Sequence, residues 1–163
     1  MKTGIFYGTS TGTTERVARL IAKAVGADDA DVYDVAKTGP SKLGEYEFVI
    51  LGASTYGAGD LQDDMADFLD GVRALDLKGK KAAAFGCGDE GMSSTFCNGV
   101  DEIFKALKET GATVVGTFNT FPYQFDHSAA VPVQGAEAVG LLIDDVNHSD
   151  KTEQRVNEWV KTL

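Results

Sequence analysis

Hydroxyl side chains and glycines are concentrated in one short stretch near the N-terminus, Gly8-Thr9-Ser10-Thr11-Gly12-Thr13-Thr14. The apolar run Ile5-Phe6-Tyr7 precedes it, and apolar residues at i, i+3, i+4 and i+7 from Val17 to Ala24 follow it, so the pattern predicts strand, tight loop and helix. A helix N-terminus presents unpaired N–H groups and the positive end of the helix dipole. The stretch therefore predicts a loop that holds a phosphate group.

The motifs and residues that this loop lacks limit the kinds of ligand it could bind. A nucleotide-hydrolysing loop would read GxxxxGK[ST] and a dinucleotide fingerprint GxGxxG, and neither pattern is present. No Lys or Arg occurs from Gly8 to Thr14, so backbone N–H groups and hydroxyls would hold the phosphate without a formal counter-charge. This favours a single terminal phosphomonoester over a triphosphate with magnesium. Taken alone, the loop is equally compatible with a capped Ser/Thr-rich turn.

The composition limits the class of protein and its partners. The chain has 163 residues, which we interpret as one domain spanning 1–163, and a net charge of -10 that argues against nucleic acid or anionic membrane and favours basic protein surfaces. Without a membrane-length apolar run or a signal peptide, a soluble cytoplasmic protein, taken to be a monomer, is expected. Cys87 and Cys97 lack metal or redox spacing, and His127 and His148 are expected at the surface, so no metal site is predicted.

Strand and helix patterns alternate along the chain. Apolar strand segments are predicted around residues 31–35, 48–51, 80–87, 113–118 and 139–143, and helical spacing recurs over 65–72, 100–107 and 156–163. Asp150 and Glu153 resemble a capping box at the start of the last helix. This alternation predicts an α/β fold, a parallel sheet with helices on both faces.

One segment breaks the alternation. Residues 119–138 have no clear period and contain Phe121, Tyr123 and Phe125, and an irregular loop of this length in a compact domain is usually functional or an insertion with its own packing. We interpret it as an insertion that interrupts the last strand. Ligands of such sheets bind beyond the carboxyl ends of the strands, which directs attention to the loops after Tyr7, Leu51 and Phe85.

The second and third of these loops favour a flat ligand. Residues 52–61 place the aromatic Tyr56 among small residues, and residues 86–92 combine glycines with Met92, whose polarizable sulfur can lie against a ring. Either loop alone could be a mobile glycine-rich turn. Because all three loops should converge on one sheet edge, together they predict a site for a planar ligand with a phosphate tail.

Four motifs resemble the flavodoxin family: the opening loop, Ser-Thr-Tyr-Gly-Ala-Gly-Asp-Leu-Gln, Phe-Gly-Cys-Gly-Asp and Val-Gly-Leu-Leu-Ile-Asp. The resemblance covers essentially the whole chain, and the insertion is similar to that of the long-chain class. It implies a three-layer doubly wound sandwich with a five-stranded parallel sheet in the order 2-1-3-4-5, the last strand interrupted by the insertion, and flavin mononucleotide (FMN) as cofactor.

The resemblance also implies the site residues. Thr9, Ser10, Thr11, Gly12, Thr13 and Thr14 would hold the FMN phosphate; Ser54, Thr55, Tyr56, Gly57 and Ala58 would form the loop on the inner side of the ring; and Cys87, Gly88, Asp89 and Met92 would lie along its pyrimidine end and outer face. The chain departs from the family pattern in this third loop. Met92 lies near the place of the usual stacking Tyr, and the loop looks one residue shorter.

The function implied is a low-potential one-electron carrier, not an enzyme, that passes through a neutral semiquinone and docks basic surfaces of redox proteins. By resemblance the donor would be an NADPH-dependent flavin reductase or an oxoacid oxidoreductase, and the acceptor is open. Acidic residues beside the loops, including Asp60, Asp63 and Asp64, would oppose the charge of reduction, although helix-dipole complementarity and solubility explain them equally well.

Three other functions compete with this interpretation. A receiver-type phosphoacceptor would need acidic residues where Gly8-Thr9 and Gly52-Ala53-Ser54 stand, which argues against it. A flavodoxin-like FMN-dependent reductase working by two-electron transfer is a closer alternative. An adaptor domain with a decayed ligand site is the third, because the outer aromatic residue is missing.

Overall fold

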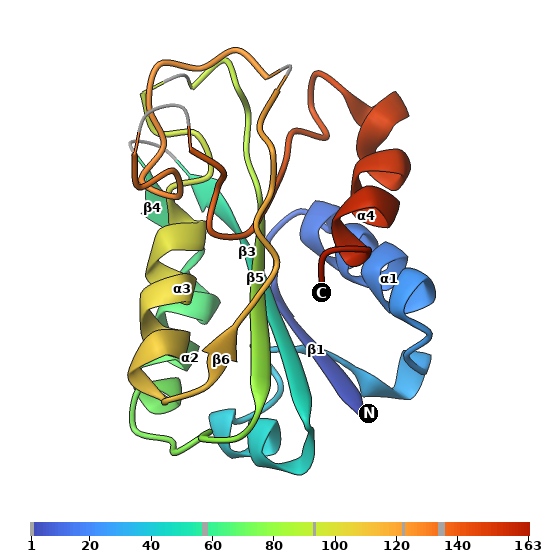
Figure 1. The fold of residues 1–163 in the computed structure, drawn as a ribbon, viewed down its shortest axis with the longest axis vertical. Helices are drawn as coiled ribbons and strands as arrows, with labels where there is room; N and C mark the ends of the chain where they lie inside the picture. Colours follow the sequence, from blue (N-terminus) through green and yellow to red (C-terminus); the bar gives the residue numbers. More distant parts are fainter. Residues whose placement is uncertain (1, 57–58, 93, 122, 134–135) are drawn as a thin grey trace.

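A mostly parallel β-sheet with α-helices on both faces forms the framework of the protein (Figure 1). The structure is a computed structural model that describes residues 2–56, 59–92, 94–121, 123–133 and 136–163. Its strands are β1 (Thr3–Gly8), β2 (Val32–Asp34), β3 (Phe48–Tyr56), β4 (Asp60–Leu61), β5 (Lys81–Cys87), β6 (Thr113–Val114) and β7 (Leu141–Ile143). Its helices are α1 (Thr13–Val25), α2 (Asp63–Val72), α3 (Gly99–Glu109) and α4 (Thr152–Val160), with 3-10 turns η1 (Asp29–Asp31), η2 (Pro40–Glu45) and η3 (Ser149–Lys151).

The strand order confirms the predicted topology. Neighbouring strands follow the order β2-β1-β3-β5-β6, and every pairing along this path is parallel. β6 pairs with the start of β5 at Lys81, and β7 pairs with its end at Phe85–Cys87. β6 and β7 are therefore two pieces of one edge strand that the insertion interrupts. The short β4 adds an antiparallel partner to the end of β3.

Apolar side chains explain why these elements pack as three layers. The central strand β3 begins with Phe48–Leu51, all buried, as expected for a strand covered on both faces. Figure 1 shows α1 and α4 on one face of the sheet and α2 and α3 on the other. Each helix buries a stripe at helical spacing, such as Val17 and Ile21 of α1 and Met65 and Phe68 of α2.

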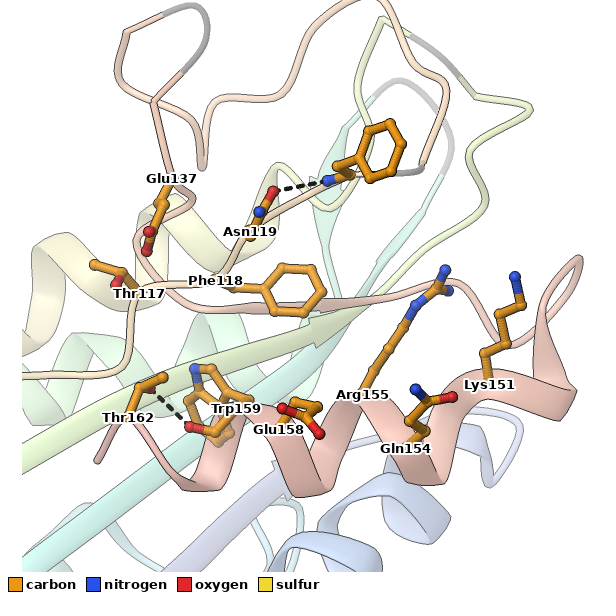
Figure 2. A pocket seen from close by; sticks show the side chains of 11 residues that line it. Thr117, Phe118, Asn119, Glu137, Lys151, Gln154, Arg155, Glu158, Trp159 and Thr162 are labelled. Carbon is orange, nitrogen blue, oxygen red and sulfur yellow. Dashed lines mark hydrogen bonds between the residues drawn. The ribbon is translucent and has the colours of Figure 1, made fainter.

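The edge strand is shorter than the pattern at residues 113–118 predicts. β6 ends at Val114, and Gly116 adopts φ 91°, a conformation outside the β region. The Trp159 indole of α4 donates a hydrogen bond to the Gly116 carbonyl (2.8 Å). The carbonyl is therefore bonded to a side chain instead of to a neighbouring strand. Figure 2 shows Phe118 and Trp159 on opposite sides of the space between this segment and α4.

The predicted capping box at the last helix is wrong. Asp150 lies in η3, and no side chain caps the N-terminus of α4. Instead, the first helical residue, Thr152, is buried and donates its hydroxyl to Asp145 Oδ1 (2.7 Å). Because of this extra 3-10 turn, the Asp150 carboxylate is not placed to accept hydrogen bonds from the unpaired backbone N–H groups at the start of α4.

The insertion has its own apolar packing, as the sequence predicts. An antiparallel bridge between Phe118 and Ala138 closes its base. Tyr123 and Phe125 of the insertion pack against Phe96, which lies in the segment before α3; the ring centroids are 5.1 and 5.0 Å from that of Phe96. Phe121 is 84% exposed and takes no part in this cluster. The insertion is therefore anchored over the carboxyl end of β5 through aromatic contacts.

Within the described part of the chain, none of the helices has the length and apolar character needed to cross a membrane.

Candidate functional site

The carboxyl ends of β1, β3 and β5 lie side by side at one edge of the sheet. Gly8 of β1 is in register with Ala53 of β3, and Ser54 of β3 is in register with Cys87 of β5. The first and third loops start from Gly8 and Cys87, whereas β3 continues to Tyr56, so residues 52–56, expected in the second loop, belong to the strand. The predicted convergence of the loops on one edge is confirmed.

The first loop offers several free hydrogen-bond donors. The Thr9 hydroxyl accepts the Gly12 N–H (2.9 Å), and Gly12 turns the chain into α1 with φ 93°, where a residue with a side chain would be strained. No side chain caps the helix start at Gly12. Ser10 and Thr11 are exposed and Thr13 is half-buried. This arrangement suits an anion, because uncapped N–H groups and hydroxyls converge at the positive end of the helix dipole.

Thr14 differs from its neighbours in this loop. It is fully buried, and its hydroxyl lies 2.6 Å from the Ser54 hydroxyl at the end of β3. The Thr14 side chain therefore joins the start of α1 to β3, while its backbone N–H lies in the uncapped first turn of the helix. The spacing alone could not reveal this, because a hydroxyl residue one position inside a helix can point either way.

Cys87 lies beside this hydroxyl pair. Burial raises the pKa of its thiol to about 12, and the hydrogen bond with Thr14 only partly opposes the shift. Cys97 is also a free, buried cysteine whose pKa burial raises. Both thiols are therefore neutral near pH 7, and Cys87 contributes a small neutral side chain to the sheet edge.

The second and third loops meet at a small hollow. Thr55 of one loop and Gly88, Asp89 and Met92 of the other line it, together with residues 95–97, and its volume is about 40 Å³. A Cβ on Gly88 would lie 2.9 Å from Cys97 Sγ, so only glycine fits there. Ligand pockets usually hold several hundred Å³, so this hollow alone is too small for the ring site that the sequence predicts.

The rest of that ring site falls on residues that the structure does not describe. Gly57 and Ala58 lie outside the described residues, and for Tyr56 only the backbone, paired with Asp60, is described. Met92 is half-exposed, as a side chain lying against the outer face of a ligand would be.

The segment before α3 was not recognised from sequence as part of the site. The Gly99 N–H donates to Thr55 Oγ1 (2.9 Å), and a Cβ on Gly59 would lie 2.9 Å from Asn98 Nδ2. These contacts hold the end of β3 and the loop after it against the N-terminus of α3. Only the glycines at positions 59 and 99 could have indicated such a close approach.

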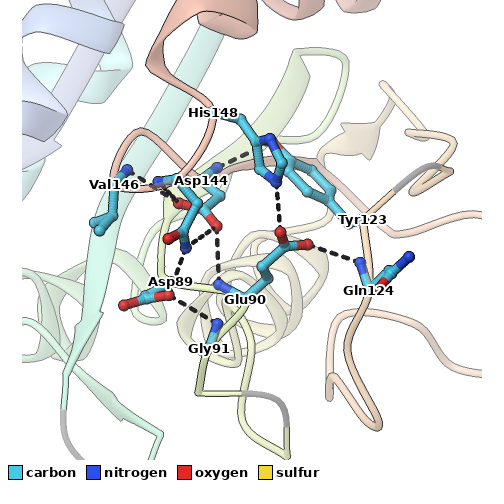
Figure 3. A network of polar contacts seen from close by, with 9 residues as sticks. Asp89, Glu90, Gly91, Tyr123, Gln124, Asp144, Val146 and His148 are labelled. Carbon is cyan, nitrogen blue, oxygen red and sulfur yellow. Dashed lines mark hydrogen bonds and ion pairs between the residues drawn. The ribbon is translucent and has the colours of Figure 1, made fainter.

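A network of hydrogen bonds joins the third loop to the end of β7 and to the insertion (Figure 3). Asp144, fully buried at the end of β7, accepts the Glu90 N–H with Oδ2 (3.0 Å) and the Val146 N–H with Oδ1 (2.9 Å). Asn147 donates its backbone N–H to Oδ1 and its side-chain amide to Oδ2. The Asp144 N–H in turn donates to the Tyr123 hydroxyl (2.9 Å), which links the insertion to the network.

Glu90 and His148 complete this network. The Glu90 carboxylate is hydrogen-bonded to His148 Nε2 through one oxygen and accepts the Gln124 N–H (2.7 Å) with the other. His148 is partly buried and bonded to a carboxylate, whereas the sequence predicted a surface residue. The carboxylate comes from a distant loop, 58 residues earlier, so no local spacing could predict the pair.

Glu90, Asp144 and His148 could bring ligand atoms within 4.8 Å of one another, the separation expected around a metal ion. Both oxygens of Asp144 already accept two hydrogen bonds each, and both oxygens of Glu90 are engaged. The arrangement is thus a hydrogen-bond network whose acceptor positions are filled by N–H donors.

These features define a doubly wound α/β protein in which an uncapped, hydroxyl-rich helix start and two glycine-containing loops share the carboxyl edge of the sheet. The flavodoxin family model matches residues 5–159. A flavodoxin of Helicobacter pylori is 42% identical over 163 residues, covering 99% of this chain and 96% of the relative. Flavodoxin 1 of Escherichia coli K12 is 39% identical over 162 residues, covering 99% and 92%.

Solved structures agree with this match. The Fusobacterium nucleatum flavodoxin bound to flavin mononucleotide superposes with a TM-score of 0.88 at 25% identity, covering 99% of this chain and 96% of that one. Oxidised flavodoxin 1 of Bacillus cereus gives a TM-score of 0.70 at 30% identity, covering 100% and 99%. The chain belongs to the flavodoxin family.

Asp144 makes the stability of the fold depend on pH in a predictable direction. Burial raises its pKa, but hydrogen bonds from Asn147 and from the Glu90 and Val146 N–H groups outweigh this, so the pKa lies below the ordinary value of 3.8. A lowered folded-state pKa contributes stability above the unfolded-state value, and this contribution is lost as the pH falls through the folded-state value. Asp144→Asn should cost about 1–3 kcal/mol of unfolding free energy at pH 7.

Urea unfolding between pH 3 and pH 7 measures this effect. The gap between the parent protein and Asp144→Asn should stay constant above about pH 5 and narrow below pH 3.8. Asp28→Asn, at an exposed carboxylate before η1, is the matched control and should follow the parent curve. A gap that is absent at neutral pH or widens in acid would contradict the role given to Asp144.

Proposed function

We propose that the protein carries electrons one at a time between redox proteins, using non-covalently bound FMN, and is not an enzyme. The observation that carries the proposal is the uncapped, hydroxyl-rich N-terminus of α1 at the carboxyl ends of β1, β3 and β5. Membership in the flavodoxin family and the FMN-bound relative from Fusobacterium nucleatum support it.

The donors of the first loop fit the phosphate of FMN. Thr9, Ser10, Thr11, Thr13 and Thr14 would bind it with hydroxyls and N–H groups, Gly12 would turn the chain beside it, and the positive end of the α1 dipole would supply the favourable field. The Gly12 N–H itself donates to the Thr9 hydroxyl, and the Thr14 hydroxyl also contacts Ser54 (2.6 Å). The nearest cation in sequence, Arg16, is paired with Asp145. The phosphate is thus recognised by directed donors more than by net charge.

The other two loops fit the ring of FMN. Ser54, Thr55, Tyr56, Gly57 and Ala58 form the inner wall, and Cys87, Gly88, Asp89 and Met92 form the pyrimidine end and the outer wall. Gly88 allows the backbone to come close, and the half-exposed Met92 thioether replaces an aromatic cover on the outside. When bound, FMN supplies the one-electron chemistry that protein side chains lack.

The charges around the ring loops favour a low reduction potential. Residues 52–61 and 86–92 contain no Lys or Arg, and they carry Asp60, Asp89 and Glu90. Such carboxylates oppose the negative charge that reduction adds and so destabilise the reduced state, with the smallest effect from Glu90, which contacts His148. A low potential makes the reduced protein a strong donor.

The same charges support docking by basic redox partners. Asp60 in β4 and Asp63 and Asp67 in α2 are exposed, and no ion pair in the described part of the chain involves them. Unpaired carboxylates steer a positively charged surface towards the nearby loops. A flavin reductase or an oxoacid oxidoreductase would be the donor, and the carrier would act as a cytoplasmic monomer.

Phosphate recognition can be tested by placing a negative charge in the first loop. Ser10→Glu should weaken FMN binding by at least about tenfold, because like charges would meet at the helix N-terminus. Riboflavin, which lacks the phosphate, should bind with affinity changed by less than about twofold. Quenching of flavin fluorescence measures both. Ser41→Glu, an equally exposed serine in η2, should leave both affinities as in the parent. Equal losses for FMN and riboflavin would overturn the assignment.

The carrier function is tested by anaerobic reductive titration of the FMN-loaded protein, followed by visible absorbance. A third spectral form, distinct from the oxidised and reduced forms, should accumulate at half reduction, and the second step should need a strong reductant. Direct conversion of oxidised to reduced spectrum would instead support the two-electron reductase, and a colourless protein that does not bind FMN would support a decayed site.

Docking through acidic residues predicts a salt dependence. Electron transfer from the reduced protein to cytochrome c, a basic haem protein, should slow by at least about threefold between low and high ionic strength. Transfer to ferricyanide, a small anion, should quicken instead. Asp63→Asn combined with Asp67→Asn should reduce the slope for cytochrome c, whereas Asp28→Asn, an exposed Asp on the opposite edge, should not. A rate to cytochrome c that is independent of salt would rule out docking through these carboxylates.

A further inference from the structure

One histidine joins the third loop to the turn after β7. His148, in this turn, is hydrogen-bonded through Nε2 to the Glu90 carboxylate of the third loop (Figure 3). The side chain of His148 is 29% exposed and that of Glu90 is 18% exposed, so the contact is largely shielded from water. The function proposed above assigns no role to this contact.

Glu90 connects three parts of the chain. Its second carboxylate oxygen accepts the Gln124 N–H of the insertion (2.7 Å), and its own N–H donates to Asp144 Oδ2 (3.0 Å). The neighbouring Asp89 carboxylate accepts the side-chain amide of Asn147 (2.7 Å). The position of the third loop therefore depends on both the turn after β7 and the insertion.

The residues next to Glu90 adjoin the proposed ring site. Gly88, Asp89 and Met92 line the hollow between the second and third loops. The Met92 N–H donates to the Asp89 carbonyl (2.9 Å), so the two residues are joined within the loop. A change in the hold on Glu90 would therefore reach the residues proposed to form the pyrimidine end and the outer wall.

His148 is the member of this group whose charge ordinarily changes near neutral pH. Histidine gains or loses its proton between about pH 5 and pH 8. Neutral imidazole has one N–H that either nitrogen can carry, whereas both nitrogens donate in the charged form. Protonation therefore secures the donor to Glu90 and adds an attraction between opposite charges.

The charged and titratable groups around this imidazole come from four elements. Among the described residues, Glu90 and Asp144 bring carboxylate oxygens within 4.8 Å of an imidazole nitrogen. The Tyr123 ring lies 5.7 Å from the imidazole, and burial raises the pKa of its hydroxyl to about 12, so it stays neutral. Arg155 of α4 lies over the Tyr123 ring, and Lys151 of η3 contacts the histidine through its backbone N–H. The carboxylates are therefore the direct partners of the added charge.

We propose that His148 is a positioning residue for the flavin ring: its protonation tightens the hold on Glu90, fixes the third loop and strengthens ring binding. The inference rests on the proposed function, because it takes the third loop to be a wall of the ring site. A loop that is already fixed loses less conformational freedom on binding, so the protonated form has the higher affinity. A residue outside the three site loops thus makes cofactor binding respond to pH.

Riboflavin binding to the full chain after removal of FMN tests the inference. Riboflavin is the probe because a phosphate group has its own ionisation near about pH 6. Quenching of flavin fluorescence should give an affinity at least about threefold higher at about pH 5.5 than at about pH 8. His148→Gln, which keeps a hydrogen-bond donor but cannot titrate, should abolish this difference. His127→Gln is the matched control at the other histidine of the chain, exposed in the insertion, and should preserve it.

Glu90→Gln separates the pair from an effect of the histidine alone. Without the carboxylate, protonation of His148 gains no ionic partner in the third loop, so the pH dependence should disappear although the histidine is present. The double variant Glu90→Gln with His148→Gln should then show no more loss of pH dependence than either single variant.

A measurement on the parent protein needs no variant to fold. If riboflavin binds the protonated form about threefold more tightly, linkage requires that riboflavin move the NMR titration of the His148 ring upward by about half a pH unit. The titration of the His127 ring should stay where it is.

The two proposals fail in different ways. Riboflavin that binds the parent with the same affinity across this pH range, or more tightly at high pH, would overturn the role of His148 and leave the ring site intact. A pH dependence that survives in His148→Gln would do the same. A parent protein that binds riboflavin at neither pH would overturn the ring site and this inference together.

Discussion

The parallel register of β1, β3 and β5 is the constraint on which the site depends. Gly8 is opposite Ala53 and Ser54 is opposite Cys87, so three loops that are distant in sequence begin at one edge of the sheet. Because Phe6, Ile50 and Ala84 along these strands are fully buried between the two helical layers, a slip of one residue would move apolar side chains to the wrong face. The hydroxyl pair of Thr14 and Ser54 then fixes the first loop to the second. The core thus sets the positions of the loops, and a few local hydrogen bonds, such as that between Thr14 and Ser54, are enough to maintain these positions.

The absence of basic residues from the site loops has two linked consequences. Phosphate binding must come from N–H groups and hydroxyls that the fold has already oriented, and such directed donors discriminate shape and protonation better than a mobile lysine would. Few cations lie near the ring loops, since Arg16 is paired with Asp145, the loops contain no Lys or Arg, and Glu90 contacts His148. The same lack of basic residues underlies the proposed phosphate recognition and the proposed low potential, because a basic phosphate clamp would weaken the field that disfavours the reduced state.

The sequence predicts local features of this structure well and contacts across the sheet poorly. The strand order, the helical stripes and the interrupted edge strand follow from apolar periodicity, which reports burial directly. The early end of β6 does not, because it depends on a hydrogen bond from Trp159, 43 residues later, to Gly116. In the site, the hydroxyl-rich loop is evident from residue types, whereas the inward turn of Thr14 depends on a partner on β3. The His148–Glu90 pair joins loops 58 residues apart, so neither residue carries a local signal of the other.

Asp144 connects the irregular insertion to the loop after β5. Its carboxylate accepts four N–H bonds, one of them from Glu90 in the ring loop, and its own N–H donates to Tyr123 of the insertion. A buried carboxylate is costly unless every acceptor position is used, so removing any one donor penalises the whole network. This makes the turn after β7, the ring loop and the insertion one cooperative unit. Tyr123 also packs one ring face against the Arg155 guanidinium of α4, 4.0 Å from the ring centroid. The insertion is therefore held to the third loop through Asp144 and to α4 through this stacking contact.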